Sequence, residues 1–277
     1  MIFLKYILLS VAAVAIVFGL CFLLTGLIRR KRKKKLPLIL HILISVGIGL
    51  LIICVVGFCY LNVHYSAREE ALAVLSDPTG AVVSRIDGGY FVDGSGQDAA
   101  LIFYPGAKVD SQAYLPLMKE IANKGVDCFL LELPMRMAIF DQNAADHIMA
   151  EYDYPTVMVG GHSMGGMIAA GYASAHKDTV DGVVLLAAYP TEPLDGSVGL
   201  LSVYGTEDKV LSRDAYENAK QHFPSGAVET VIDGGNHAQF GNYGAQEGDG
   251  EATITAKEQQ TQIAYSVLKF AEALSDR

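Results

Sequence analysis

The stretch "VMVGGHSMGGM", residues 157–167, places Ser163 between glycines, after a short apolar run and before small residues that favour a helix. Residues 161–165 match GxSxG, the nucleophile elbow, in which small flanking residues permit a sharp strand-to-helix turn that exposes the serine oxygen. The pentapeptide alone is only moderately specific. Its context supports the interpretation, because a buried strand is expected at 156–161 and a helix at about 163–176.

Around this elbow, apolar runs alternate with helical patterns, which is typical of a largely parallel sheet covered by helices on both faces. Strands are predicted at about 99–106, 126–134, 156–161, 182–188, 199–205 and 227–233. Helices are predicted at about 110–125, with Asp110 as its cap, and at 141–152, 163–176, 213–222 and 254–274. Before them, "EEALAVL" (69–75) suggests a helical stalk and "AVVSRIDGGYFVDG" (81–94) an antiparallel hairpin.

A serine hydroxyl is a poor nucleophile near neutral pH and needs a base, itself oriented by an acid. "YGTEDKV" places Asp208 just after one predicted strand, and "DGGNHAQFG" places His237 just after the last. The order Ser163, Asp208, His237 is the chain order of the α/β-hydrolase triad. Glu207 and Glu192 are alternative acids, although Asp208 has the better spacing.

The remaining parts of such a site can also be assigned residues. An acyl-transfer transition state needs donors for its oxyanion, one expected from the backbone amide of Met164. The loop "YPGAKV" (104–109) offers the second, from Gly106 or Ala107. His162 precedes the serine but would point elsewhere on the turn, so we expect it to support the elbow rather than act as the base.

Other chemistries have little support in the sequence. "GAQEGDGE" (244–251) has acids and glycines but lacks the EF-hand spacing, so a solvated loop is favoured over a calcium site. The soluble part contains no HExxH, GxxxxGK[ST] or GxGxxG pattern, so no metal and no cofactor are predicted. Its acidity argues against nucleic acid as a partner.

The N-terminal region differs sharply from the rest. The first 67 residues carry eight Lys or Arg and no Asp or Glu, whereas the remainder carries 13 basic and 30 acidic residues. Two charge-free stretches, 6–28 and 36–67, are each long enough to cross a bilayer as a helix, with spans expected at 6–28 and 36–63. The basic run "RRKRKKK" (29–35) between them favours a cytoplasmic loop, which places both ends of the chain outside the cytoplasm.

These features predict three parts: a two-helix membrane anchor (1–67), a stalk with a hairpin (68–98) and a catalytic core (99–277). A cleaved signal peptide is disfavoured, because the first apolar core is too long and no small-residue cleavage pattern follows it. Only Cys128 lies in the polar part, so no disulfide is expected within that domain.

The motifs "FYPGAKVDSQAY", "GGHSMGGMIAA" and "GGNHAQFGNYGAQEGDGEATI" resemble the α/β-hydrolase superfamily over about residues 99–274. The similarity is closest to its compact bacterial group related to dienelactone hydrolases, the fold-5 family. The resemblance implies Ser163 as nucleophile, His237 as general base and then acid, and Asp208 as its orienter. The oxyanion loop departs from the HGGG form of many esterases, which leaves Gly106 and Ala107 as alternatives for the second donor.

The resemblance also bears on the substrate. Many relatives carry a large lid between two late strands, whereas only residues 189–198 are available for one here. The sequence therefore predicts a membrane-anchored serine esterase with an open site, acting on a small-molecule ester or a surface-displayed acyl group. Arg136, in "PMRMAIF" (134–140), could contact an anionic part of the substrate. An acyltransferase, a peptidase or a non-catalytic membrane-anchored binding protein remain alternatives, and no oligomeric state is implied.

Overall fold

The computed structural model describes residues 2–31, 37–96 and 98–276. The chain divides into two compact units, Met1–Val63 and His64–Arg277, each described here by itself.

The first unit consists of two long helices, α1 (Ile2–Lys31) and α2 (Leu38–Asn62). Two segments, Ala13–Arg30 and Leu38–Tyr60, are long and apolar enough to cross a membrane, and few of their side chains are buried within the structure. The predicted span 6–28 falls within α1, and the predicted span 36–63 matches α2 except for Pro37 and Val63, which flank that helix. Residues 32–36, which include part of the basic run, lie outside the described residues.

Polar side chains join the two helices. The hydroxyl of Thr25 lies 2.8 Å from Nε2 of His41 and 2.7 Å from Oγ of Ser45. Hydrogen bonds of this kind hold apolar helices together where the hydrophobic effect contributes little.

The second unit is built on an eight-stranded sheet of order β1-β2-β4-β3-β5-β6-β7-β8. Strands β3 to β8 run parallel, whereas β2 pairs antiparallel with both β1 and β4. The α/β class predicted from the sequence is confirmed. The strands are β1 (Val82–Ile86), β2 (Gly89–Asp93), β3 (Ala99–Tyr104), β4 (Asp127–Leu131), β5 (Thr156–His162), β6 (Gly182–Leu186), β7 (Gly199–Gly205) and β8 (Val228–Ile232).

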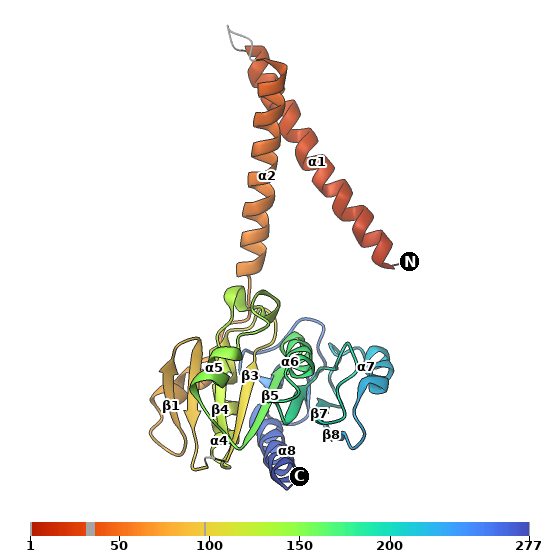
Figure 1. Ribbon diagram of the computed structural model, residues 1–277. Coiled ribbons are helices and arrows are strands. Elements are labelled where there is room, and N and C mark those ends of the chain that lie inside the picture. Colours follow the sequence, from red (N-terminus) through yellow and green to blue (C-terminus); the bar gives the residue numbers. More distant parts are fainter. Residues whose placement is uncertain (1, 32–36, 97, 277) are drawn as a thin grey trace. The chain divides into compact units, whose positions relative to one another are not determined.

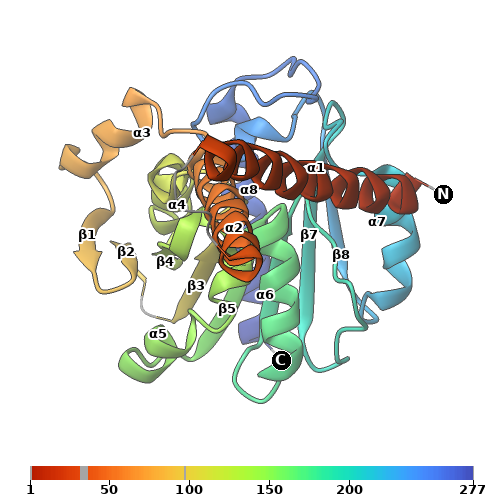
Figure 2. The same cartoon turned by 90° about the horizontal axis from the view of Figure 1, so that it is seen from above.

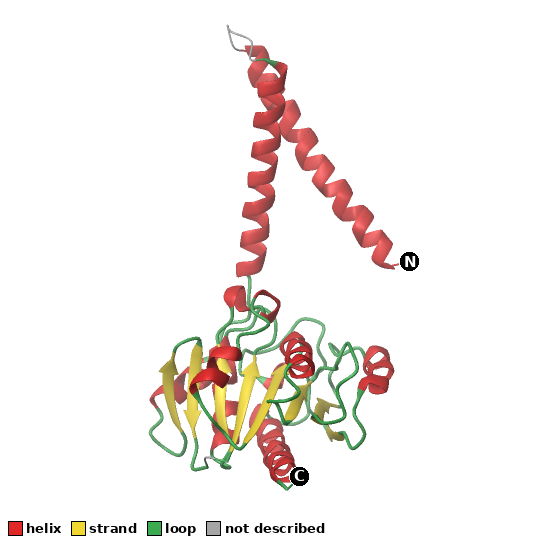
Figure 3. Ribbon diagram, viewed as in Figure 1, coloured by secondary structure: helices red, strands yellow, loops and turns green. Residues whose placement is uncertain are grey.

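Helices cover both faces of this sheet (Figures 1 and 3). They are α3 (Glu69–Ala73), α4 (Leu115–Ala122), α5 (Asp146–Glu151), α6 (Met164–Ala175), α7 (Arg213–Ala219) and α8 (Ala256–Ser275). Short 3₁₀ turns are η1 (Val74–Ser76), η2 (Ser111–Tyr114), η3 (Pro134–Arg136), η4 (Ala138–Phe140), η5 (Lys220–His222) and η6 (Ala238–Phe240).

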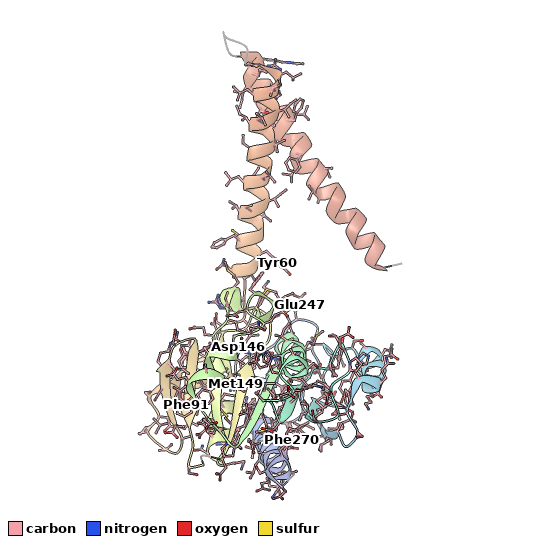
Figure 4. All side chains as sticks on the ribbon, viewed as in Figure 1. Tyr60, Phe91, Asp146, Met149, Glu247 and Phe270 are labelled. Carbon is pink, nitrogen blue, oxygen red and sulfur yellow. The ribbon has the colours of Figure 1, made fainter. Side chains whose placement is uncertain are left out.

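The two faces have separate apolar cores. Helices α4 and α8 pack on one face and α5 and α6 on the other, as the view from above shows (Figure 2). Phe270 of α8 belongs to the first core, whereas Met149 of α5 packs against the second (Figure 4). The central strands β3 and β4 are buried along their whole length, which explains their nearly continuous apolar sequences.

The hairpin of residues 81–94 is present as β1 and β2, whose register pairs Ile86 with Gly89. The segment expected to be a stalk packs against the domain instead, because α3 buries Ala71 completely.

The expected Asp110 cap is wrong. Its carboxylate caps no helix but binds the guanidinium of Arg136 and the amide of Ala67. The helix therefore begins later than predicted, with η2 before α4.

The parallel strands place their carboxyl ends at one edge of the sheet. Loops that follow β3, β5, β7 and β8 there carry Gly106, Ser163, Asp208 and His237. Residues 187–198, which join β6 to β7, contain no helix or strand, so no helical lid forms at that connection. This edge is where ligands bind in open parallel sheets.

Candidate active site

Ser163 lies on a strained turn between β5 and α6. Its backbone has φ 53° and ψ −124°, a conformation that side-chain-bearing residues rarely adopt. The turn is held by three hydrogen bonds: Ser163 N donates to Leu186 O at 2.9 Å, and Gly166 N and Met167 N donate to Ser163 O at 3.1 and 3.2 Å. Strain of this kind persists only where surrounding contacts enforce it, and it gathers at functional sites.

The glycines beside Ser163 are needed because other backbone lies against them. A Cβ atom on Gly165 would overlap the carbonyl oxygens of Tyr104 and Pro105, at the end of β3. A Cβ on Gly161 would meet Tyr104 O at 2.6 Å. The small residues of GxSxG therefore let the elbow approach the loop after β3, where the second oxyanion donor is expected.

Asp208 and His237 form a buried pair. Nδ1 of His237 donates to Oδ2 of Asp208 at 2.8 Å, and the two side chains are only 2% and 0% exposed. The other oxygen of Asp208, Oδ1, accepts from the amides of Val210 and Leu211 at 2.9 and 2.8 Å. Because the carboxylate accepts the proton that Nδ1 carries, Nε2 of the neutral imidazole has the free lone pair that a general base requires.

The alternative acids are elsewhere. Glu192 is exposed, and the carboxylate of Glu207 accepts from the hydroxyl of Thr206 at 3.4 Å.

The imidazole of His237 lies beside the elbow. Its ring centroid is 4.4 Å from that of His162, the residue immediately before Ser163. Within the described part of the chain, no hydrogen bond joins the hydroxyl of Ser163 to His237. Catalytic hydrogen bonds of this type are often long in unliganded enzymes and shorten when substrate binds.

Asp249 fixes the turn that carries His237, and the sequence had suggested only a solvated loop here. Its carboxylate accepts from the amides of His237 at 3.3 Å, Ala238 at 2.8 Å and Gly250 at 2.8 Å. These hydrogen bonds join the turn that carries His237 to the loop 244–251. The sequence did not single out Asp249 for this role, because its contact with the His237 amide joins residues 12 positions apart.

His162 is buried next to the elbow and supports it by a hydrogen bond. It is 1% exposed, and its Nδ1 lies 2.8 Å from the hydroxyl of Tyr114. Burial, together with the neighbouring His237, holds the pKa of His162 well below its ordinary value, so the ring is neutral. Burial likewise raises the pKa of Tyr114, which stays protonated and can donate to Nδ1. The sequence did not single out Tyr114, because nothing local links it to a position 48 residues away.

The loop after β3, residues 105–110, is called the oxyanion loop below. The amide of Gly106 donates to the hydroxyl of Tyr114 at 3.1 Å, and the amide of Lys108 donates to Arg136 O at 2.8 Å. Between them, the amide of Ala107 makes no hydrogen bond with any described residue, and neither does that of Met164 at the start of α6. Two free N–H groups therefore remain near the elbow, while that of Gly106 is occupied.

Arg136 lies beside the oxyanion loop but is already paired. Its Nε donates to Oδ1 of Asp110, and its side chain is 35% exposed. Both residues line a cavity of about 270 Å³ together with Pro105, Val109, Ser111, Gln112, Glu132, Leu133 and Met135. Because the cavity contains acidic as well as basic groups, the guanidinium is less free to bind an anionic substrate than the sequence suggested.

Residues 100–261 match the model of the alpha/beta hydrolase family. No curated protein matches the sequence.

Solved structures share the fold at low sequence identity. Est1E from Butyrivibrio proteoclasticus aligns with a TM-score of 0.51 and 13% identity, covering 72% of this chain and 100% of that one. CarC, a serine hydrolase involved in carbazole degradation, aligns at 0.52 and 13%, covering 70% and 100%. A membrane phospholipase A, described as a bacterial virulence factor, aligns at 0.52 and 14%, covering 84% and 98%. At these identities the similarity is one of fold.

Proposed function

Because the chain belongs to the alpha/beta hydrolase family, we propose that it is a serine hydrolase that cleaves carboxylic esters through an acyl-enzyme. One observation supports this most directly: the buried hydrogen bond between Asp208 and His237, beside the strained turn of Ser163. A buried acid that orients an imidazole next to a partly exposed serine is the arrangement that activates a hydroxyl near neutral pH.

Each residue has a role in the proposed reaction. Nε2 of His237 takes the proton from Ser163 Oγ as that oxygen attacks the ester carbonyl, and Asp208 stabilises the resulting imidazolium. The amides of Met164 and Ala107 bind the oxyanion. His237 then gives its proton to the leaving alcohol, and the acyl group remains on Ser163. Water, deprotonated by the same imidazole, releases the acid and restores the enzyme.

A fluorophosphonate probe tests the proposal. Wild-type protein should be labelled covalently, and Ser163→Ala should abolish labelling while the protein keeps its secondary structure by circular dichroism. The matched control is Ser174→Ala, a serine near the end of α6 whose hydroxyl donates to Ala170 O at 3.1 Å. Absence of labelling in folded wild-type protein would contradict a serine hydrolase and favour a non-catalytic binding protein.

The same residues could transfer the acyl group to another acceptor or cleave a peptide. Ester hydrolysis is preferred because the connection 187–198 is short and contains no helical lid that could exclude water from the strand ends. Product analysis with p-nitrophenyl esters of increasing chain length, with and without a competing alcohol, separates hydrolysis from transfer. We expect short acyl chains to be favoured, from a small molecule or a surface-displayed acyl group.

We further propose that α1 and α2 anchor the protein in the cell membrane, with the hydrolase unit outside the cytoplasm. The support is the basic run 29–35 between the two apolar segments, since short basic loops stay in the cytoplasm. Protease added to intact cells should remove the C-terminal domain, detected with an antibody to residues near the C-terminus. Protection until the membrane is permeabilised would reverse this orientation.

A further inference from the structure

The residues that follow α2 pair with the oxyanion loop. Residues 64–68, here called the linker strand, run parallel to that loop, with Tyr65 opposite Val109. Tyr65 N donates to Lys108 O at 2.8 Å, and Asp110 N donates to Tyr65 O at 3.0 Å. Residues more than 40 positions apart are thus joined immediately beside the Ala107 amide.

The linker strand is bound through side chains as well. The carboxylate of Asp110 accepts from the amide of Ala67 at 3.3 Å and lies 3.4 Å from Nε2 of His64. The same carboxylate binds Arg136, whose carbonyl accepts from Lys108. Asp110 therefore connects the linker strand, the oxyanion loop and η3.

The linker strand also reaches the loop that carries His237. The Tyr65 ring lies 5.5 Å from that of Tyr243, and the hydroxyl of Tyr65 accepts from the amide of Glu247 at 3.3 Å. Arg68 N donates to Asn242 O at 2.8 Å. One short segment therefore contacts both loops on which the proposed chemistry depends.

The oxyanion loop needs such support because its backbone is strained. Lys108 has φ 58°, in the left-handed region that a lysine rarely occupies. Its peptide groups on both sides are held, by Arg136 O and by Tyr65 N. The adjacent amide of Ala107 has no partner of its own within the described structure, so its direction is set by these neighbours.

We propose that Tyr65 and Asp110 are positioning residues: through them the linker strand holds the oxyanion loop and the His237 loop in the arrangement that stabilises the transition state. This inference rests on the proposed hydrolase function. It makes the segment between α2 and the catalytic domain a working part of the active site rather than a passive tether.

The test uses the full-length protein and p-nitrophenyl acetate. Tyr65→Ala keeps the backbone hydrogen bonds of residue 65 to the oxyanion loop. It removes the ring beside Tyr243 and the hydroxyl that accepts from the Glu247 amide, so the His237 loop is no longer held. The kcat should therefore fall about 10- to 100-fold while KM changes less than about twofold, because the base on that loop acts mainly in the transition state. The affinity of a trifluoromethyl ketone, which forms an oxyanion on the serine, should fall in parallel. Tyr265→Ala, a tyrosine 56% exposed on α8, is the matched control and should leave all three values unchanged.

Two further variants distinguish a positioning role of the linker strand from a role as a simple connection and from an effect on folding. Inserting Gly-Ser-Gly-Ser between Val63 and His64 lengthens the connection but keeps the linker strand, so kcat should not change. Changing His64→Gly, Tyr65→Ser, Ser66→Gly and Ala67→Ser together should reproduce the loss, with faster amide hydrogen exchange in residues 105–114. If the insertion lowers kcat as much as Tyr65→Ala does, the linker strand is not the positioning element.

Hydrogen exchange keeps this inference distinct from the proposed function. If the wild-type protein neither hydrolyses esters nor reacts with fluorophosphonate, the function is wrong, but faster exchange in the fourfold variant would still support the coupling of the two segments. If the wild type is active and Tyr65→Ala retains its kcat and ketone affinity, the inference is wrong and the function stands.

Discussion

Asp208→Asn is expected to lower kcat for ester hydrolysis by about 10⁴-fold, or about 5 kcal/mol of transition-state stabilisation, while the fold is retained. The reason is the direction of the two oxygens of Asp208. Oδ1 accepts from the amides of Val210 and Leu211, so an asparagine keeps its carbonyl oxygen there and turns its NH₂ group toward His237. His237 must then accept at Nδ1 and carry its proton on Nε2, where it cannot act as a base.

The measurement is steady-state hydrolysis of p-nitrophenyl acetate, with thermal unfolding followed by circular dichroism. Glu207→Gln is the matched control: it changes the adjacent acid, which bonds Thr206 rather than His237, and should leave kcat within about twofold. An Asp208→Asn variant that keeps wild-type kcat would show that another group orients the base.

Gly165→Ala should destabilise the protein by about 3 kcal/mol or more, the largest stability effect expected here. The added methyl group would overlap two backbone carbonyl oxygens, those of Tyr104 and Pro105, and backbone cannot move aside as a flexible side chain can. Relief requires the start of α6 to move away from the oxyanion loop. Fluorophosphonate labelling of Ser163 should therefore slow even in the fraction that stays folded.

The same helix supplies the control. Gly171 has nothing within 4 Å of an added Cβ and is exposed in α6, so Gly171→Ala should stabilise the protein by about 0.5–1 kcal/mol. Urea unfolding of both variants, with labelling rates measured alongside, compares the same substitution at a crowded and an open position. Equal stability of the two variants would mean that the elbow has room to relax.

Much of the fold was predictable because it depends on local pattern. Nearly continuous apolar runs indicated the buried strands β3 to β7, and helical periodicity indicated α6 and α8 between or after them. The predictions were wrong where a side chain contacts residues that are far away in the sequence. Asp110 resembled a helix cap by position, yet its carboxylate binds Arg136 and Ala67, which no local pattern could reveal.

The candidate catalytic residues were likewise predictable in part. Ser163, Asp208 and His237 could be named from the sequence, because parallel strands bring their carboxyl ends to one edge and each residue follows such an end. The distances and hydrogen bonds between these residues could not be predicted. The 2.8 Å contact between Asp208 and His237 depends on how β7 and β8 pair, since the residues are 29 positions apart.

By itself, the sequence determined an α/β domain after two apolar segments, with a nucleophile elbow and acid and base candidates in order. Periodicity and residue spacing suffice for those conclusions. Only the tertiary structure decided three other features. The hydroxyl of Tyr114 accepts from the Gly106 amide, Asp249 accepts from the amides of the His237 turn, and the linker strand forms hydrogen bonds with the oxyanion loop. Each of these depends on a hydrogen bond between residues made neighbours only by folding, because a backbone amide can bind whichever acceptor the fold brings near.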